Sequence, residues 1–270
     1  MTAVRLIQVP YYLGHEHADL SRGPAKLADA IEGDGIVIQP PRPNVLPNEV
    51  AESFSVIRAV ASAVRETVEE RRFPLVLAVN CFTSLGTVAG LGRQVGVVWF
   101  DAHGDFHTPD TTTSGFLDGM GLAMLLGDGW SELRHSVAGL RPIPAEHALL
   151  VGARDLDPTE QSRVDASPLR RADAQTLDVA LDELSGQVDA VYVHIDLDVI
   201  DSSVARANAL SVPGGFDVDE LERALATISS RFEIAAAALT AYDPSVDPES
   251  RVPAIATRLA RHLLPEKIAR

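Results

Sequence analysis

Short apolar segments alternate with amphipathic ones along most of the chain. The apolar segments contain three to seven residues each, and such continuous runs are typical of strands buried on both faces. They occupy residues 4–9, 36–38, 75–79, 94–100, 148–152, 189–195 and 233–239. A proline-rich loop follows the second segment, with Pro40, Pro41, Pro43 and Pro47. The pattern therefore predicts a set of short buried strands.

The amphipathic segments carry apolar side chains at spacings of three and four residues, which predicts helices. The clearest helix spans residues 48–70, with one apolar face formed by Val50, Phe54, Ile57, Ala61, Val64 and Val68. Asp217 and Glu220 form a capping pattern, so another helix is expected to begin there. The remaining helices are predicted over residues 22–31, 84–91, 120–126, 159–164, 177–184 and 252–264.

This alternation of buried strands with helices is typical of a parallel sheet covered on both faces. We therefore predict an α/β fold, a three-layer α/β/α sandwich with a mainly parallel sheet. The sequence contains no internal repeat and no clear linker, so residues 1–270 are expected to form a single domain. Ligand sites in such folds lie at the carboxyl ends of the strands.

Composition narrows the possible partners and the location of the protein. The net charge of −15 repels phosphate backbones and anionic lipids, so we expect neither a nucleic acid nor a membrane as a partner. The single cysteine excludes an internal disulfide and fits a reducing compartment. The N-terminus lacks the layout of a signal peptide, and no apolar run approaches the ~20 residues of a spanning helix. We expect a cytoplasmic protein.

Two predicted strands end in clusters of possible metal ligands. Because alternate side chains of an extended segment share one side, each cluster can face a single ion or ion pair. The alternative for the first cluster is a solvated acidic loop. The ligands are Asp101, His103 and Asp105 after residues 94–100, and the carboxylates Asp196 and Asp198 in the segment His194-Ile-Asp196-Leu-Asp198 at the end of residues 189–195.

Together the two clusters bring several carboxylates to one edge of the predicted sheet. Converging carboxylates repel one another and raise each other's pKa unless cations are bound. A carboxylate-rich site with few imidazoles favours Mn²⁺ or Mg²⁺. Two such ions would convert water into a hydroxide nucleophile at neutral pH, so hydrolysis at an electron-poor carbon or phosphorus is the expected reaction class.

The motifs around these clusters resemble those of the ureohydrolase (arginase/agmatinase) family. The matching segments are Asp101-Ala-His-Gly-Asp105, Thr111-Thr-Thr-Ser-Gly115, Gly152-Ala-Arg-Asp-Leu-Asp-Pro158 and Asp196-Leu-Asp-Val-Ile-Asp201. The resemblance implies an α/β/α sandwich with two Mn²⁺ ions and a homo-oligomer, whether dimer, trimer or hexamer. It also implies hydrolysis of a C–N bond in a small linear guanidine or amidine on an amino-acid-like scaffold, by a metal-bridging hydroxide.

The resemblance assigns roles residue by residue. Asp101 and Asp196 would bridge both ions, Asp105 would complete one site, and His103 with Asp198 would complete the other. The substrate's amino and carboxylate groups would be held by Thr112, Ser114, Asp155, Asp157 and Glu160. Two structural alternatives stay open. Thr112 and Ser114 can satisfy their own loop, and Asp155 and Asp157 can cap a helix before Pro158.

Five positions depart from the family pattern. Cys81 stands where the family has a metal-ligand His, and Asp118 stands where it has a proton-transferring His. Ala241 replaces a Glu that binds the guanidinium group. His107 replaces an Asn that contacts substrate in the family, and His194 replaces a Ser that precedes the second aspartate cluster. Catalytic roles are expected for Asp105, Asp118 and His107, with Asp118 acting as acid or base if burial raises its pKa.

Cys81 has three interpretations. As a thiolate it remains a ligand of the first metal and gives a softer site. As a nucleophile it needs a base, for which His107 and His194 are candidates. As a structural residue it is a small buried apolar group. The ligand interpretation is preferred, because Cys81 occupies the position at which the family resemblance expects a metal ligand.

Ala241 bears on the substrate. A buried guanidinium requires a carboxylate partner, so either Asp243 or Asp118 replaces the missing Glu or the substrate is less basic. An N-hydroxyguanidine, as in N-hydroxyarginine, a formimino group or an amide would meet the second condition. A rival hypothesis is a catalytically impaired homologue, a metal-binding or regulatory protein that keeps the fold without the chemistry.

Overall fold

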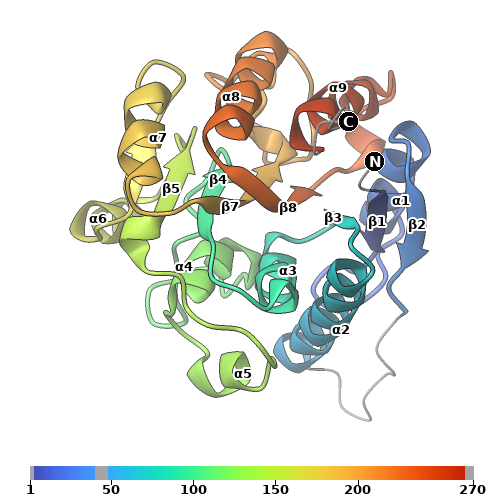
Figure 1. The fold of residues 1–270 in the computed structure, drawn as a ribbon, viewed down its shortest axis with the longest axis horizontal. Helices are drawn as coiled ribbons and strands as arrows, with labels where there is room; N and C mark the ends of the chain where they lie inside the picture. The colour runs from blue at the N-terminus through green and yellow to red at the C-terminus, as the bar shows by residue number, and fades with distance from the viewer. Residues whose placement is uncertain (1–2, 40–47, 265–270) are drawn as a thin grey trace.

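The strands of the described chain form one parallel sheet (Figure 1). The computed structural model describes residues 3–39 and 48–264, so the proline-rich loop predicted at 40–47 lies outside the described residues. The order across the sheet is β2-β1-β3-β8-β7-β4-β5-β6. The strands are β1 (Val4–Val9), β2 (Asp34–Val37), β3 (Phe73–Ala78), β4 (Gly96–Phe100), β5 (Ala148–Val151), β6 (Arg170–Ala172), β7 (Ala190–Asp196) and β8 (Glu233–Thr240).

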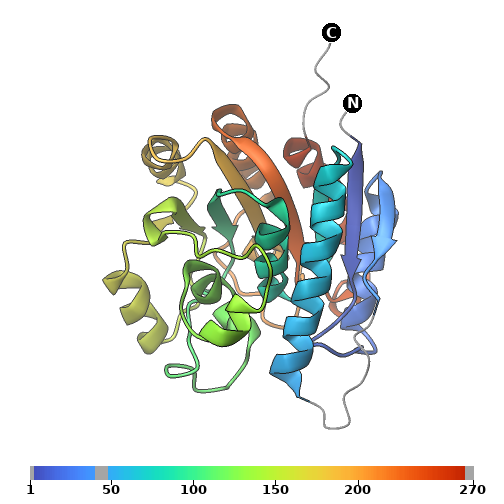
Figure 2. The ribbon, with the colours of Figure 1, turned by 60° about the horizontal axis from the view of Figure 1, so that its bottom comes forward.

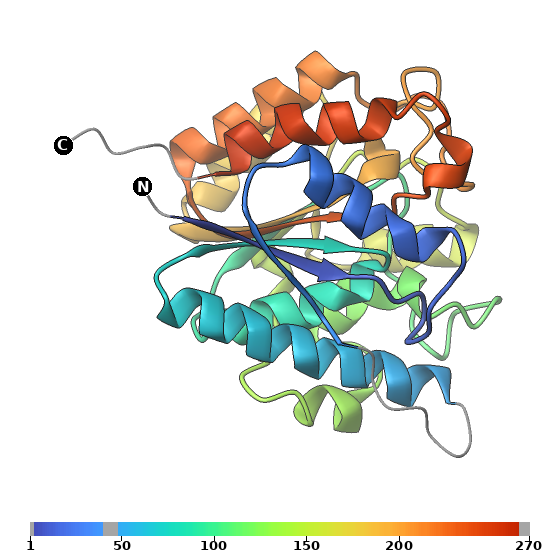
Figure 3. The same ribbon diagram turned by 90° about the vertical axis from the view of Figure 1, so that its right-hand side faces the viewer.

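Helices cover both faces of the sheet, so the predicted three-layer α/β/α sandwich is confirmed (Figure 3). One face is covered by α2 (Glu49–Glu69), α3 (Ser84–Leu91), α4 (Gly121–Leu126), α5 (Ser131–His135) and α6 (Pro158–Ala166). The other face is covered by α1 (Gly23–Ala30), α7 (Leu177–Ser185), α8 (Val218–Arg231) and α9 (Arg251–Leu263). Figure 2 shows the long helix α2 running beside β1 and β3.

The central strands are buried on both sides, which explains their continuous apolar sequences. Along β4, Trp99 belongs to the core under α2 and α3, whereas Phe100 belongs to the core under α8 and α9. Every residue of β3, β4, β5 and β7 is buried. Because these strands are buried on both sides, the residues at which the following loops begin are held in place.

The helix caps follow local chemistry. Asp217 and Glu220 form a reciprocal capping box at the start of α8, as the sequence predicts. The Asn48 side chain accepts a hydrogen bond from Ala51 N and caps α2. At α6, the Asp157 side chain accepts from Thr159 N and Glu160 N, and Pro158 takes the first helical position.

The site residues lie in the segments that leave the carboxyl ends of β3, β4 and β7, and the segments after β4 and β7 are long. The loop after β4 reaches from Asp101 to the 3₁₀ turn at Asp118–Met120. Short 3₁₀ turns also follow β3 at Cys81–Thr83 and β7 at Leu197–Val199. Over residues 3–39 and 48–264, none of the helices combines the length and the apolar character that crossing a membrane requires.

Candidate metal centre

A cavity of about 540 Å³ opens at the carboxyl ends of the central strands. Asp101 lies just beneath it and is only 1% exposed. The cavity is lined by all the other residues predicted for the site, namely Cys81, His103, Asp105, His107, Thr112, Ser114, Asp118, Asp155, Asp157, Glu160, Asp196 and Asp198. The structure therefore brings both metal-ligand clusters and the predicted substrate residues to one place.

His103 lies between two carboxylates. Its Nδ1 is 3.3 Å from Asp101 Oδ1 and 3.3 Å from Asp198 Oδ2. Burial alone would lower the pKa of His103, but its hydrogen bonds to Asp101 and Asp198 outweigh burial and raise the pKa to about 12. In the metal-free protein a protonated His103 thus supplies one of the positive charges that these carboxylates attract.

Asp105 carries a buried oxygen without a partner. It is 7% exposed, and its Oδ2 has no hydrogen-bond partner among the described residues. Its backbone has a φ of 48°, a left-handed conformation that non-glycine residues adopt rarely and that Asp tolerates better than most. Burial and the charge of Asp101 raise its pKa well above the usual range. A cation at this oxygen would satisfy both the lone pairs and the charge.

The second cluster is fixed by its own backbone. Asp196 Oδ1 accepts a hydrogen bond from Asp198 N at 2.9 Å. Asp198 Oδ1 accepts from Ala102 N at 3.2 Å, and its Oδ2 accepts from Asn208 Nδ2 at 3.2 Å. Burial, then the charge of Asp198, raises the pKa of Asp101 to about 6 and that of Asp196 well above its usual range. The carboxylates are therefore held close together at an electrostatic cost.

Cys81 points into this group from the loop after β3. Its thiol donates to Asp196 Oδ2 at 3.1 Å and lies 3.3 Å from Thr240 Oγ1. Burial, reinforced by the Asp196 charge, raises the pKa of the thiol well above its usual value. Without a cation the sulfur therefore stays protonated, which disfavours a free thiolate nucleophile. His107, one candidate base, is instead paired through Nε2 with Asp157 Oδ2 at 3.0 Å.

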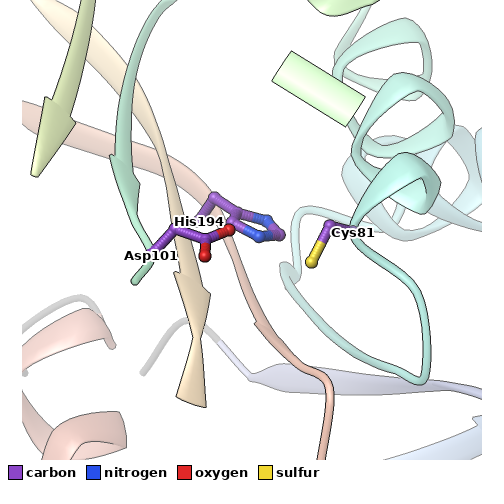
Figure 4. A group of neighbouring side chains, drawn as sticks. All are labelled: Cys81, Asp101 and His194. Atoms are coloured by element: carbon purple, nitrogen blue, oxygen red, sulfur yellow. The ribbon is translucent and has the colours of Figure 1, made fainter. Parts of the chain in front are cut away.

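His194 lies in the core directly below the carboxylates. It is fully buried, and burial lowers its pKa to about 3, so its imidazole is neutral. Cys81, Asp101 and His194 each offer a ligand atom, and these atoms lie within 4.8 Å of one another. Figure 4 shows the imidazole between the carboxylate of Asp101 and the sulfur of Cys81. Asp101, His103 and Asp198 form a second group within the same limit.

Asp118 faces the Cys81 loop. Its Oδ2 accepts from Asn80 Nδ2 at 2.6 Å, and its Oδ1 accepts from Phe82 N at 3.0 Å. Burial raises its pKa to about 7, which meets the condition set for an acid or base. However, both oxygens are engaged in holding the segment that carries Cys81, so the geometry favours a positioning role.

The predicted substrate residues differ in how far the protein itself already engages them. Thr112 and Ser114 accept hydrogen bonds from Gly115 N and Phe116 N, as in a loop that satisfies itself, although both line the cavity. Asp157 caps α6 and pairs with His107. Glu160 is buried and accepts from Phe106 N at 2.9 Å. Asp155 is the least constrained, and its Oδ2 lies 3.9 Å from His103 Nε2.

Several lining residues were not predicted. Asn80 holds Asp118 and also accepts from Leu13 N at 2.7 Å. Asn208 bridges Asp198 and the carbonyl of Ala241. Tyr12 lies just beyond β1, where the rule for carboxyl ends of parallel strands would have found it. No local motif marks Asn208, because its role depends on a long-range contact.

These residues fit a divalent metal centre. Two groups of buried ligand atoms adjoin each other, and the Asp105 oxygen has no protein partner among the described residues. The crowded carboxylates have raised pKa values, as expected where metal charges are absent from a site built for them. The donor set contains carboxylates, imidazole and one thiolate, all of which bind first-row divalent ions.

Comparison with known proteins identifies the family of the chain. The model of the arginase family matches residues 5–265. The arginase of Bacillus caldovelox is 31% identical over 222 residues, which cover 77% of this chain and 74% of the relative. The solved structure of a Bacillus caldovelox arginase has a TM-score of 0.88 and 27% identity, with 100% of each chain covered. Formimidoylglutamase from Bacillus subtilis shares the fold, with a TM-score of 0.77 at 18% identity and coverage of 97% of this chain and 86% of that one. The chain therefore belongs to the arginase family, whose members hydrolyse non-peptide C–N bonds in linear amidines.

Proposed function

We propose that the protein is a metal-dependent hydrolase of a small guanidine or amidine that is carried on an amino-acid-like scaffold. The observation that carries the proposal is the convergence of both ligand groups on one cavity of about 540 Å³. The ion beside Asp101, His103 and Asp198 is proposed to be Mn²⁺, because this ligand set is mainly carboxylate. We extend to the protein the homo-oligomeric state that the family resemblance implies.

Two divalent ions, when bound, supply the Lewis-acid activation of water that hydrolysis of a C–N bond requires. In this proposal Asp105 orients that water through the carboxylate oxygen that does not bind metal, and His107 protonates the departing amine. Both side chains line the cavity, and Asp157 holds the imidazole of His107. Thr112, Ser114 and Asp155 at the mouth bind the amino and carboxylate groups of the scaffold.

The preferred substrate group is proposed to be an N-hydroxyguanidine, with a formimino group as the next choice and an ordinary guanidinium last. Ala241 lines the cavity without offering a charge, and the oxygens of Asp118 accept from Asn80 and Phe82. Asp243 also lines the cavity, but its Oδ1 caps the following turn at Ser245 N. A strongly basic group would therefore lack a dedicated carboxylate, whereas a less basic group needs none.

Product analysis of the Mn²⁺-loaded protein tests this proposal. Arginine, N-hydroxyarginine, agmatine and formiminoglutamate would each be supplied, and the amine product would be quantified by mass spectrometry. We expect kcat/KM for N-hydroxyarginine to exceed that for arginine by about tenfold or more, equivalent to ~1.4 kcal/mol in the transition state. A preference for arginine would overturn the substrate assignment. Full metal occupancy without turnover of any substrate would favour the regulatory homologue.

A variant of Ala241 sharpens the test. Its backbone φ of 61° already accommodates a Cβ atom, so Ala241→Glu restores a carboxylate with limited extra strain. We expect this variant to raise turnover of arginine relative to N-hydroxyarginine. Ala241→Gln is the matched control, because it adds the same volume without the charge.

A further inference from the structure

Below the carboxylates lies a cluster of sulfur, nitrogen and oxygen donors that differs from the rest of the site. Cys81, Asp101 and His194 are 2%, 1% and 0% exposed. One ligand atom of each lies within 4.8 Å of the others, and Figure 4 shows the His194 ring between the Asp101 carboxylate and the Cys81 sulfur. The cluster draws its members from three separate elements, namely the loop after β3, the end of β4 and strand β7.

The imidazole of His194 is held in one orientation. Its Nδ1 lies 3.0 Å from Ser84 Oγ and 3.1 Å from Tyr192 OH. Its ring stacks on Trp99 with a centroid separation of 3.6 Å and an interplanar angle of 16°. When Nδ1 carries the proton and donates to Ser84, Nε2 keeps its lone pair. Metal-binding histidines are usually held in this way by a partner at the other ring nitrogen.

The second ring nitrogen and the cysteine share a neighbour. His194 Nε2 lies 3.3 Å from Thr240 Oγ1, and the same hydroxyl lies 3.3 Å from Cys81 Sγ. Thr240 Oγ1 also lies within hydrogen-bond distance of the Ile195 carbonyl, at 3.3 Å. Thr240 therefore holds the sulfur and the imidazole nitrogen on either side of one small hydroxyl group.

Trp99 supports two members of the cluster at once. Its indole stacks on His194, and its Nε1 donates to Asp101 Oδ2 at 3.2 Å. Trp99 and His194 are register partners in the β4–β7 pair, so the backbone itself enforces this stacking. The ligands thus have outer partners that fix their positions before any metal binds.

A further observation points to a cation here. Asp105 Oδ2 is buried and lacks a hydrogen-bond partner among residues 3–39 and 48–264. A Cβ atom on Gly121 would lie 3.3 Å from this oxygen and 3.4 Å from the Cys81 carbonyl carbon, so Asp105 and Cys81 flank the same glycine. The Asp105 oxygen lies outside the group of ligand atoms within 4.8 Å of one another, but it offers a buried donor on the same side of the site.

We propose that Cys81 Sγ, His194 Nε2 and Asp101, with Asp105 as the adjoining fourth donor, form a metal position that prefers Zn²⁺ to Mn²⁺. The family resemblance places an imidazole at position 81 and a small hydroxyl at position 194. In this chain the imidazole nitrogen comes from β7 instead of from the loop. Thiolate with imidazole favours Zn²⁺, whereas the neighbouring position at His103 and Asp198 is mainly carboxylate and favours Mn²⁺. A tetrahedral Zn²⁺ site needs donors roughly 3.5 Å apart, a separation that falls within the 4.8 Å limit of the cluster.

This inference rests on the proposed metal dependence, but its test needs no turnover. Metal-free protein would be titrated with Co²⁺, whose complex with a thiolate absorbs in the near ultraviolet, and Zn²⁺ affinity would be measured by competition with a chromophoric chelator. We expect one thiolate–Co²⁺ band in the parent protein and none in Cys81→Ser. We expect His194→Ser to shift the band and to weaken Zn²⁺ binding by about 100-fold or more.

His103→Asn is the matched control, because it alters the neighbouring position and should leave the band unchanged. An unaltered band together with unaltered Zn²⁺ affinity in His194→Ser would overturn the proposal, as would a band that persists in Cys81→Ser. If His194→Ser folds poorly by circular dichroism, the double variant Cys81→His/His194→Ser decides. A ligand role for His194 predicts that the returned imidazole restores tight metal binding, whereas a purely structural role predicts no restoration.

Discussion

The carboxylate of Asp118 accepts hydrogen bonds from Asn80 Nδ2 and Phe82 N, the residues on either side of Cys81. The sequence places Asp118 where the family resemblance expects a proton-transferring His, and so predicts a catalytic role. The contacts that favour a positioning role join residues 36 and 38 positions apart. Such contacts depend on how two loops meet, which no local pattern of residues encodes. Position in a motif therefore places Asp118 at the site, and its contacts add a positioning role to the predicted catalytic one.

Replacing Asp118 tests whether it positions the Cys81 loop or transfers protons. Asp118→Ala removes two buried hydrogen bonds to a carboxylate, and we expect the free energy of unfolding to fall by about 2–4 kcal/mol, with weaker binding of the metal at Cys81. Urea unfolding followed by circular dichroism gives the first quantity, and chelator competition gives the second. Asp110→Ala, on the exposed part of the same loop, should change neither. Unchanged stability and metal affinity with a large fall in kcat would restore the acid–base role.

At the scale of elements, residue periodicity captured the fold because the central strands are buried on both faces. Two elements were not predicted. Strand β6 (Arg170–Ala172) lies at the sheet edge and has two arginines among its three residues, so it lacks the apolar run of a buried strand. Helix α5 (Ser131–His135) is too short to show a helical period. The position of the site could be predicted because parallel strands bring their carboxyl ends to one edge of the sheet. The residues that hold its loops in place come from other elements, so the sequence did not reveal them.

Helix α6 provides such a support. Glu160 in its first turn accepts from Phe106 N at 2.9 Å, and Arg163 Nε donates to the Phe106 carbonyl at 2.9 Å. The helix thus binds both the N–H and the carbonyl group of Phe106, the residue that follows Asp105. The sequence predicts that Glu160 binds substrate, and the contact offers a positioning role instead.

The two roles differ in how they tolerate loss of charge. Glu160→Gln keeps an oxygen that can accept from Phe106 N, so a positioning role predicts metal affinity within about threefold of the parent. Glu160→Ala leaves a buried N–H without a partner, and we expect metal affinity to fall by about 10–100-fold. Isothermal titration with Mn²⁺ measures both variants. If KM for substrate rises in Glu160→Gln while its metal affinity is unchanged, Glu160 binds substrate as the sequence predicts.

At the scale of the whole molecule, the protein carries a net charge of −15 and concentrates part of it at one buried site. Burial and mutual repulsion raise the pKa of Asp101 to about 6 and that of Asp118 to about 7, and raise those of Asp105 and Asp196 further. The protein therefore does not neutralise these buried carboxylates by itself. Bound cations and bound protons compete to neutralise them.

This competition makes the stability of the metal-free protein depend on pH. In the unfolded chain these carboxyls titrate near pH ~4, so between about pH 4 and 7 the native metal-free state holds more protons than the unfolded state. Its stability therefore falls as pH rises through that range. His194 opposes the trend, because its pKa is lowered to about 3, but only below the pH of ~6.5 at which a free imidazole titrates. Four raised carboxyls outweigh one imidazole.

Bound metal ions replace the protons, so the metal-loaded protein should not lose stability in this way. We expect the gap in thermal midpoint between Mn²⁺-loaded and chelator-treated protein to widen steadily from pH 5 to pH 8, as differential scanning calorimetry can measure. Asp105→Asn supplies the matched control, because it removes a buried charge whose oxygen lacks a partner in the described chain. At pH 8 this variant should be more stable than the parent without metal and should gain less from Mn²⁺. A gap that stays constant with pH would show that protons do not occupy the place of the metal, and that the carboxylates are stabilised by the fold itself.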